Sequence, residues 1–399
     1  MLAVALASVC RAEPAPAFAQ LLGEALAQAP ALLEQRANVN AAAADAAQAR
    51  AWLNPRFDAL AENLAAPAMS GTSQRQTTYS ITQPLEIGGK RAARIEAGER
   101  NLAAALARDR QIQVGFAAEL AMAYAGAEAS LARQSLAGEE VARASDDLRA
   151  VRALVEAGRE AGLRLAQARA SLSAAQASGQ AASAESVQAL ERLSAMAGMP
   201  TPYSGVAGSL LASPARPASA AAVAENPAVA TARAERDALD ALVAVEQRRW
   251  IPDVALSAGV RRYGSTDASG YQVGVVSAVP LFDRNARGIA AAQQRASAAD
   301  ARLTAAQLQA AGAKRSAQAQ VTAAEQRLLA AGEGEQAAAE AYRLGRIGYE
   351  AGRTSLVELL ATRRVLLDAR ALSIDARLAR VRAVATLAAA EGRLAFSGE

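Results

Sequence analysis

The stretch of sequence that decides the fold is residues 253–281, which read DVALSAGVRRYGSTDASGYQVGVVSAVPL. Its first part alternates strictly, because Val254, Leu256 and Val260 are apolar whereas Ser257 and Gly259 between them are small or polar. A second alternating part follows a turn rich in glycine and serine. Alternation with a period of two predicts β-strands with one apolar face, and a length of about 10 residues suits a tilted strand across a bilayer. A hairpin of a soluble protein is the alternative that this pattern leaves open.

The chain carries this plan twice. Four landmarks recur at a nearly constant offset: Pro30 with Pro227 and Pro55 with Pro252 at 197 residues, Pro84 with Pro280 at 196, and Gly158 with Gly352 at 194. Four matches in the same order indicate a duplicated unit. The first copy has a weaker pair of alternating segments, Arg56 to Ala66 and Gln76 to Leu85, joined by the turn residues Pro67 to Ser73.

The duplication predicts the domain organisation. Each copy starts with a helical stretch, from Phe18 to Ala51 and from Ala221 to Arg249, that ends near a tryptophan and a proline. Helices commonly stop just before proline. The predicted parts are a first repeat at 13–199 with a strand hairpin at 56–85, a linker at 200–220, and a second repeat at 221–399 with a strand hairpin at 253–281.

Long helical hairpins are predicted after each strand hairpin, in proline-free tracts from Leu85 to Met199 and from Leu281 to Glu399. Apolar residues recur every seven positions in both, as at Leu360, Leu367 and Ile374, and this spacing marks coiled-coil packing. Gly158 and Gly352 interrupt the two tracts at matching places, so the helical hairpins should have their tips near residues 158 and 352.

The amino terminus resembles a secretory signal peptide over residues 1–12. Cys10 within it is a candidate for lipidation, although Val9 stands where a small residue is usual, and an ordinary signal-region cysteine is the alternative. Every later apolar stretch is interrupted by charged or amide side chains, so any membrane crossing is predicted to use a closed barrel of strands.

Composition excludes several classes of function. The 399 residues include no histidine and one cysteine, which removes imidazole bases, most zinc sites and intramolecular disulfides. Aromatic residues make up only 4% of the chain, and its 43 basic and 39 acidic side chains are intermixed. Nucleic-acid binding usually needs a clustered basic face. Alanine, at roughly a quarter of the residues, favours long helices over a thick globular core.

The ends of the strand hairpins carry a family resemblance. The segments Gln83-Pro84-Leu85-Glu86-Ile87-Gly88-Gly89-Lys90-Arg91 and Pro280-Leu281-Phe282-Asp283-Arg284-Asn285, with Tyr349-Glu350-Ala351-Gly352-Arg353, resemble the TolC family of outer-membrane efflux proteins, and in particular its CzcC-like heavy-metal branch. The resemblance covers essentially the whole chain after the signal.

This resemblance implies a mainly α fold with a membrane β-barrel portion. The expected assembly is a homotrimer in the bacterial outer membrane, in which four strands per chain close a 12-stranded barrel continued by a periplasmic α-helical coiled-coil tunnel. The expected partners are a periplasmic adaptor protein, an inner-membrane proton-driven pump and outer-membrane lipid. The expected function is export of cobalt, zinc, cadmium, nickel, copper or silver cations, and a duct for drugs or organic solutes is the alternative.

The candidate site residues lie at the helical tips. Glu358 resembles an acidic position that lines the family's periplasmic gate, although the family has aspartate there and a second acidic position is Ala361 here. A surface glutamate paired with Arg353 or Arg364 is the alternative. Gly158, Arg159, Gly352 and Arg353 are candidates for adaptor docking. No catalytic, cofactor or metal-coordinating residue is predicted, and the scattered methionines are interpreted as packing residues.

Three other classes remain for comparison. A soluble coiled-coil scaffold explains the heptads but not the paired alternating segments. A periplasmic adaptor needs substantial additional β domains, and an enzyme needs chemistry that this composition lacks.

Overall fold

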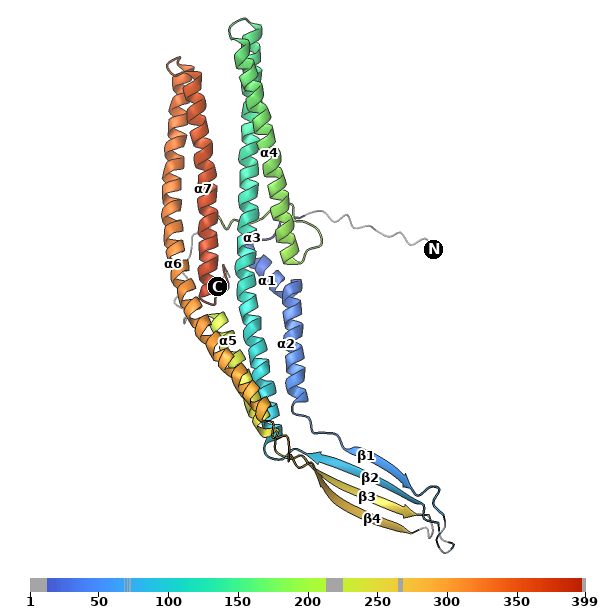
Figure 1. Cartoon of the computed structure of the whole chain (residues 1–399). Coiled ribbons are helices and arrows are strands. Elements are labelled where there is room, and N and C mark those ends of the chain that lie inside the picture. Colours follow the sequence, from blue (N-terminus) through green and yellow to red (C-terminus); the bar gives the residue numbers. More distant parts are fainter. Residues whose placement is uncertain are drawn as a thin grey trace, which may run out of the picture. The chain divides into compact units, whose positions relative to one another are not determined.

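The structure is a computed structural model that describes residues 13–67, 69, 71, 73–212, 225–264 and 268–396. The predicted signal peptide with Cys10 lies outside the described residues, as do residues 213–220 of the predicted linker and 221–224 of the predicted second repeat. The described residues form seven helices and four strands, in an order that the two halves share (Figure 1).

The first half contains α1 (Phe18–Gln28), α2 (Pro30–Gln48), β1 (Arg56–Glu62), β2 (Gln76–Leu85), α3 (Lys90–Glu156) and α4 (Gly162–Ala197). The second half contains α5 (Pro227–Arg248), β3 (Val254–Tyr263), β4 (Ser269–Ser277), α6 (Ala286–Glu350) and α7 (Leu356–Ala390). The longest helices, α3 and α6, have 67 and 65 residues without a break.

The compact units of the structure each combine segments from both halves. One, here called the sheet unit, comprises Arg36–Asp109 and Ala228–Leu308. The other, the hairpin unit, comprises Met1–Gln35, Arg110–Pro227 and Gln309–Glu399. Neither half is therefore a compact unit of its own, since each contributes strands to the first unit and a helical hairpin to the second.

The sheet unit contains one antiparallel sheet in the order β1-β2-β3-β4 (Figure 1). The central pair, β2 with β3, joins the two halves, with Ser80 opposite Gly259 and Leu85 opposite Val254. β1 ends at Glu62, shorter than the predicted segment to Ala66, because Asn63 has a positive φ of 55° and turns the chain. The four predicted alternating segments are thus the four strands of one continuous sheet.

Proline begins the helix that precedes the strand hairpin in each half. The predicted stretch from Phe18 to Ala51 is two helices, because Ala29 is extended and α2 starts at Pro30. A proline in the first helical position loses no hydrogen bond, and it disfavours a helical conformation at the residue before it. α5 likewise starts at Pro227, the counterpart of Pro30.

The hairpin unit contains a core in which small side chains allow helices to approach closely. Ala117, Ala121 and Ala125 on α3 are fully buried, and Tyr124 beside them stacks edge-on against Phe18 with 5.8 Å between the ring centroids. The Tyr124 hydroxyl donates to the Gly208 carbonyl and accepts from its N–H, each at 3.1 Å. Burial raises the pKa of this hydroxyl, against the opposite effect of its hydrogen bond to Gly208.

A carboxylate fixes the start of the segment between the halves. Glu128 on α3 accepts hydrogen bonds from the backbone N–H groups of Leu210 at 2.8 Å and Leu211 at 3.1 Å, and from the Ser209 hydroxyl. Hydrogen bonds to a charged group are the stronger ones in proteins.

In the part of the chain that the structure describes, no helix combines the length and apolarity of a bilayer-spanning helix.

Candidate functional site

The sheet has one apolar and one polar face, as its register shows. Opposite residues of antiparallel strands share a face, and side chains two apart along a strand do so too. One face carries Phe57, Ala59, Ala61, Tyr79, Ile81, Leu85, Val254, Leu256, Ala258, Val260, Tyr271, Val273 and Val275, with polar residues only toward its two ends, Thr77, Arg262 and Ser269 at one and Gln83 and Ser277 at the other. Leu256 is 48% exposed, Tyr271 87% and Val273 86%, so this apolar face has no cover within the described chain.

The opposite face carries polar and small side chains. Its members are Arg56, Asp58, Leu60, Glu62, Gln76, Thr78, Ser80, Thr82, Pro84, Ala255, Ser257, Gly259, Arg261, Tyr263, Gly270, Gln272, Gly274 and Val276, of which Leu60, Tyr263 and Val276 are the large apolar or aromatic exceptions. Arg56 pairs with Asp58 at 2.9 Å, and the Arg261 Nε donates to the Thr78 hydroxyl at 3.1 Å. A sheet that is apolar on one side and polar on the other is typical of a channel wall between lipid and water.

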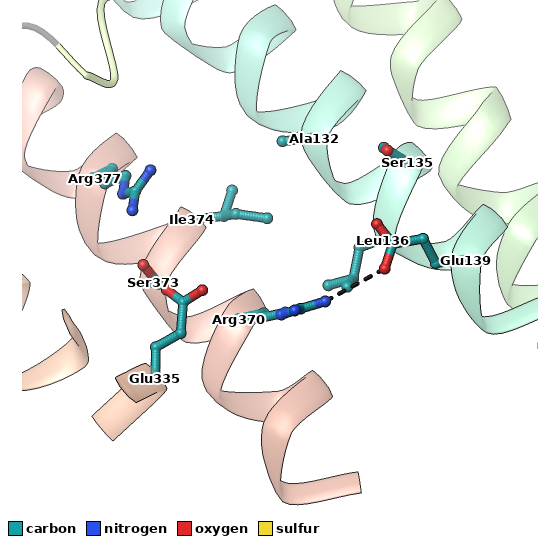
Figure 2. A pocket seen from close by; sticks show the side chains of 9 residues that line it. All are labelled: Ala132, Ser135, Leu136, Glu139, Glu335, Arg370, Ser373, Ile374 and Arg377. Atoms are coloured by element: carbon teal, nitrogen blue, oxygen red, sulfur yellow. Dashed lines mark hydrogen bonds and ion pairs between the residues drawn. The ribbon is translucent and has the colours of Figure 1, made fainter. Parts of the chain in front are cut away.

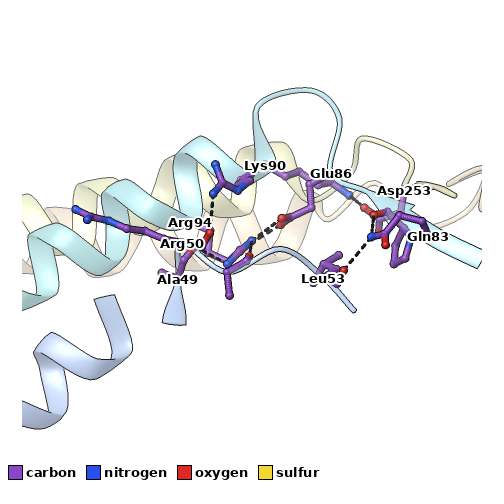
Figure 3. Close-up of polar contacts among 11 residues, drawn as sticks. Ala49, Arg50, Leu53, Gln83, Glu86, Lys90, Arg94 and Asp253 are labelled. Carbon is purple, nitrogen blue, oxygen red and sulfur yellow. Dashed lines mark hydrogen bonds and ion pairs between the residues drawn. The ribbon is translucent and has the colours of Figure 1, made fainter. Parts of the chain in front are cut away.

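The end of the sheet joins the helices through a network around Arg94 (Figure 3). Arg94, on the second turn of α3, donates to the Glu86 carboxylate and to the carbonyl oxygens of Ala49 and Ala51. The Gln83 side chain donates to the Leu53 carbonyl at 2.8 Å. The carbonyls at the end of α2 have no helical partner of their own. Arg94 therefore closes α2 and fixes the strand exit at once.

Arginine and lysine complete this junction. Arg91 donates to the Arg50 carbonyl at 2.6 Å and lies over the Trp52 ring, 4.7 Å from its centroid. Lys90 forms an ion pair with Asp253 of the second half at 2.6 Å (Figure 3). The polar residues of the segment Gln83 to Arg91 thus connect β2, α2 and α3, and they also join the two halves.

Glycine allows the halves to meet here. Gly88 has φ +65°, and a Cβ on it would lie 2.5 Å from the Ile251 side chain. The matching junction of the second half is built differently: Asn285, with φ +55°, donates its side-chain N–H to the Glu246 carbonyl at 2.9 Å. Its own backbone N–H donates to Asp283 at 2.8 Å.

The predicted tips lie at two helix reversals of similar geometry. α3 ends at Glu156 and α4 starts at Gly162, while α6 ends at Glu350 and α7 starts at Leu356. Gly158 and Gly352 have φ of +70° and +69°, and both arginines that follow them are exposed. The Arg159 N–H donates to the Leu154 carbonyl at 2.9 Å and the Arg353 N–H to the Gly348 carbonyl at 2.8 Å, as in a Schellman ending.

Glu358 lies in the first turn of α7 with an exposed side chain. Its backbone N–H donates to the hydroxyl of Ser355, the N-cap residue, at 3.3 Å. Within the described residues it pairs with neither Arg353 nor Arg364. The spacing Ser-x-x-Glu is that of a capping box, a signal present in the sequence that the search for a gate residue missed.

A charged contact connects α3 and α7 near the tips. Arg363 is only 7% exposed and pairs with Glu140 at 2.9 Å and Asp147 at 2.7 Å. Burial disfavours its charge, but pairing with the two carboxylates outweighs this and raises the pKa of the guanidinium. Arg370 pairs with Glu139 at 3.3 Å, one heptad further along α7. Sequence analysis missed this network, although the sevenfold spacing of the arginines was a readable signal.

An open pocket of about 320 Å³ lies beside this contact (Figure 2). Its charged lining is Glu139, Glu335, Arg370 and Arg377. Two carboxylates and two guanidinium groups leave the lining without net charge, so it favours neither cations nor anions. The described residues contain no group of three or more acidic, histidine or cysteine side chains placed to hold a metal ion.

A sheet with one apolar face for lipid and one polar face for water, followed along the chain by long helical hairpins, is typical of a subunit of a membrane channel wall. The comparison with known families agrees with this class: the model described as "Outer membrane efflux protein" matches residues 21–199 and 218–393. The chain belongs to the outer membrane efflux protein family. It is accordingly an outer-membrane protein with periplasmic helices, and the resemblance predicted from its signature segments is confirmed.

Relatives and solved structures give the same result. The chain is 60% identical to the nickel-cobalt-cadmium resistance protein NccC of Alcaligenes xylosoxydans xylosoxydans, over 99% of this chain and 91% of NccC. It is 62% identical to the nickel and cobalt resistance protein CnrC of Cupriavidus metallidurans, over 73% of this chain and 70% of CnrC. The open-state crystal structure of the Neisseria gonorrhoeae MtrE outer-membrane channel superposes with a TM-score of 0.80 at 21% identity, over 96% and 90% of the two chains. The predicted fold class is confirmed.

The two faces of β3 predict opposite responses to the same substitution. Leu256→Arg places a charge on the apolar face and should lower insertion into the outer membrane, at a cost of about 2–4 kcal/mol near the midplane. Ser257→Arg, on the polar face, should insert normally. Membrane fractionation and the heat-sensitive oligomer band on a gel measure both, and equal loss from the two variants would contradict the assignment of the faces.

The α3–α7 contact predicts a loss of stability on removal of Arg363. Arg363→Met keeps most of the side-chain volume but leaves Glu140 and Asp147 without their cation, so the free energy of unfolding should fall by about 1–3 kcal/mol, less than for a fully buried pair because both acids reach solvent. Arg364→Met is the matched control, since Arg364 is exposed. Thermal unfolding in detergent, followed by circular dichroism, measures both, and equal shifts would show that the pairing contributes nothing.

Proposed function

We propose that this chain is the outer-membrane channel subunit of a tripartite efflux system and that its cargo is heavy-metal cations, with nickel, cobalt and cadmium foremost, exported from the periplasm to the exterior. The observation that carries the proposal is the 60% identity to NccC over 99% of this chain, because NccC is a nickel-cobalt-cadmium resistance protein. The cation is the transported substrate. The chain itself catalyses no reaction and needs no cofactor in this proposal.

The proposed assembly is a homotrimer. Each chain supplies four strands whose outer two, β1 and β4, form the edges of its sheet. Three such sheets joined edge to edge make a closed barrel of 12 strands, with the apolar faces toward lipid and the polar faces toward the lumen. The proposed organisation of the chain has a cleaved signal at 1–12 and two repeats, 13–199 and 221–399, with a linker between them.

The proposed partners are a periplasmic adaptor and an inner-membrane proton-driven pump. Docking is assigned to the two helical tips, where Gly158 and Gly352 expose backbone groups and Arg159 and Arg353 add fixed positive charge. An exposed reversal with a cation beside it suits a partner surface that carries carboxylates.

Glu358 is the proposed gate residue. Its exposed carboxylate follows the second tip by six residues, and three-fold symmetry would place three such carboxylates at one level of the tunnel. Rings of carboxylates attract cations in narrow pores. The capping contact of its backbone N–H with Ser355 fixes the helix start without occupying the carboxylate.

Growth tests decide between cargo classes. Deletion of the gene should sensitise the host to nickel, cobalt and cadmium, and a plasmid copy should restore resistance. Sensitivity confined to drugs would instead favour the organic-solute duct.

Arg159→Glu combined with Arg353→Glu should give a normal oligomer without resistance, whereas Arg169→Glu, on an exposed face of α4 away from the tip, should behave as wild type. Full resistance in the tip variant would end the docking assignment.

Single-channel recordings test the gate. Glu358→Gln removes the charge but keeps a residue type that serves the capping box, so the helix start should survive. Cation preference and block by multivalent cations from the periplasmic side should both decrease. Glu350→Gln, exposed on the other side of the same tip, is the control. Unchanged selectivity and block in Glu358→Gln would place this carboxylate outside the conduction path.

A further inference from the structure

We propose that Arg75 and Arg262 form a binding site for the phosphorylated headgroup of a lipid in the outer leaflet of the outer membrane. The inference rests on the proposed function, because it requires the apolar face of the sheet to meet lipid and the strand turns to point toward the exterior.

The register puts both arginines on the apolar face. Arg262 lies opposite Thr77 and two residues beyond Val260, so it shares the face of Val260 and Leu256. Beyond β2 the backbone pairing continues, because the Gly264 N–H donates to the Arg75 carbonyl at 2.9 Å. A Cβ on Gly264 would lie 3.3 Å from the Cβ of Arg75, so the Arg75 side chain leaves the sheet on the side of positions 264 and 262.

A row of tyrosines separates this pair from the apolar band. Tyr79 and Tyr271 both lie opposite Val260, so the three cross the sheet in one row. From Val254 to Val260 the apolar face extends about 20 Å along the strand at 3.3 Å per residue. With a strand tilt of about 40° this length covers about 15 Å of the apolar band of an outer-membrane barrel, which is about 25 Å tall. Aromatic belts mark the level of the lipid headgroups. The arginines follow directly beyond the belt, because Arg262 is two residues past Val260 and Arg75 lies opposite Gly264, at the turn end of the sheet.

Among the residues that the structure describes, no acidic side chain on this face neutralises the two charges. The acidic residues of the four strands are Asp58 and Glu62, and both lie on the polar face. Within the described residues neither Arg75 nor Arg262 forms an ion pair, and both are exposed. Diagonal neighbours on adjacent strands are about 7–8 Å apart, so the two cations repel each other in the absence of an anion.

A phosphate monoester has the chemistry that relieves this repulsion. Arginine binds phosphate through two parallel N–H···O bonds, and two arginines at this spacing can hold one phosphate from both sides. The adjoining apolar band, where Val273 is 86% exposed, supplies contact for acyl chains below the headgroup. A lipid meets both requirements, whereas a free phosphate ion meets only the first.

Arg261 provides a matched control, since it is the neighbour of Arg262 in sequence but lies on the polar face with Thr78. The test uses purified full-length oligomer in vesicles that contain lipid A or its dephosphorylated form. Lipid A should raise the temperature at which the wild-type oligomer dissociates, and native mass spectrometry should detect bound lipid A. Arg75→Gln and Arg262→Gln should each lower its retention about five-fold, and the double variant should abolish the difference between the two lipids.

Arg261→Gln should respond to lipid A as the wild type does. Retention of lipid A by the double variant at the wild-type level would overturn the proposal, and so would equal stabilisation of the wild type by inorganic phosphate alone. A wild-type chain that forms no oligomer in either vesicle would count against the proposed channel itself, which distinguishes that failure from failure of the lipid site.

Discussion

An unpaired backbone N–H or C=O group costs several kcal/mol in the interior of a lipid bilayer. The sheet of this chain has an exposed apolar face and two edge strands, β1 and β4, that have a ladder partner on one side only among the described residues. Such a sheet is stable in lipid only when its edges meet further strands. The proposed closure of the barrel with other copies follows from this constraint, because β1 and β4 then pair with strands of neighbouring chains.

Sequence reasoning succeeded where a pattern lies within one segment of the chain. Alternation along 254–260 and 271–275 is a local pattern, and strands β3 and β4 follow it at Val254–Tyr263 and Ser269–Ser277. Proline-free tracts with sevenfold spacing likewise appear as the helical pairs α3 with α4 and α6 with α7. Such features require only the residues within one segment. The break between α1 and α2 was missed because the helical pattern on both sides of Pro30 outweighed the boundary that proline itself signals.

Contacts between distant segments could not be predicted in this way. Lys90 with Asp253 spans 163 residues of sequence, and Arg363 with Asp147 spans 216. Each partner alone looks like a solvated charge on a helix or a strand end, so nothing local assigns the pair. The segment Gln83 to Arg91 could be recognised as a resemblance. Its physical role, which is to bind the exit of β2 and the start of α3 to the backbone that follows α2, required the structure.

The two junctions also explain why a duplicated sequence stops being a duplicate where its copies touch. Gly88 leaves the space that the Ile251 side chain fills. At the offset of 196–197 residues the counterpart of Gly88 is Arg284 or Asn285, so the second half has no glycine at the matching place. Lys90 pairs with Asp253 at 2.6 Å. At the same offset Lys90 corresponds to Ala286 or Arg287 and Asp253 to Arg56 or Phe57, so neither combination repeats this ion pair. In the second half the turn from strand to helix is made by Asn285, which bonds to Glu246, whereas in the first half it is made by Gly88 and Gly89. The strands of both halves share one sheet with the same apolar and polar faces, whereas the residues of the junctions differ between the halves and form contacts that occur once.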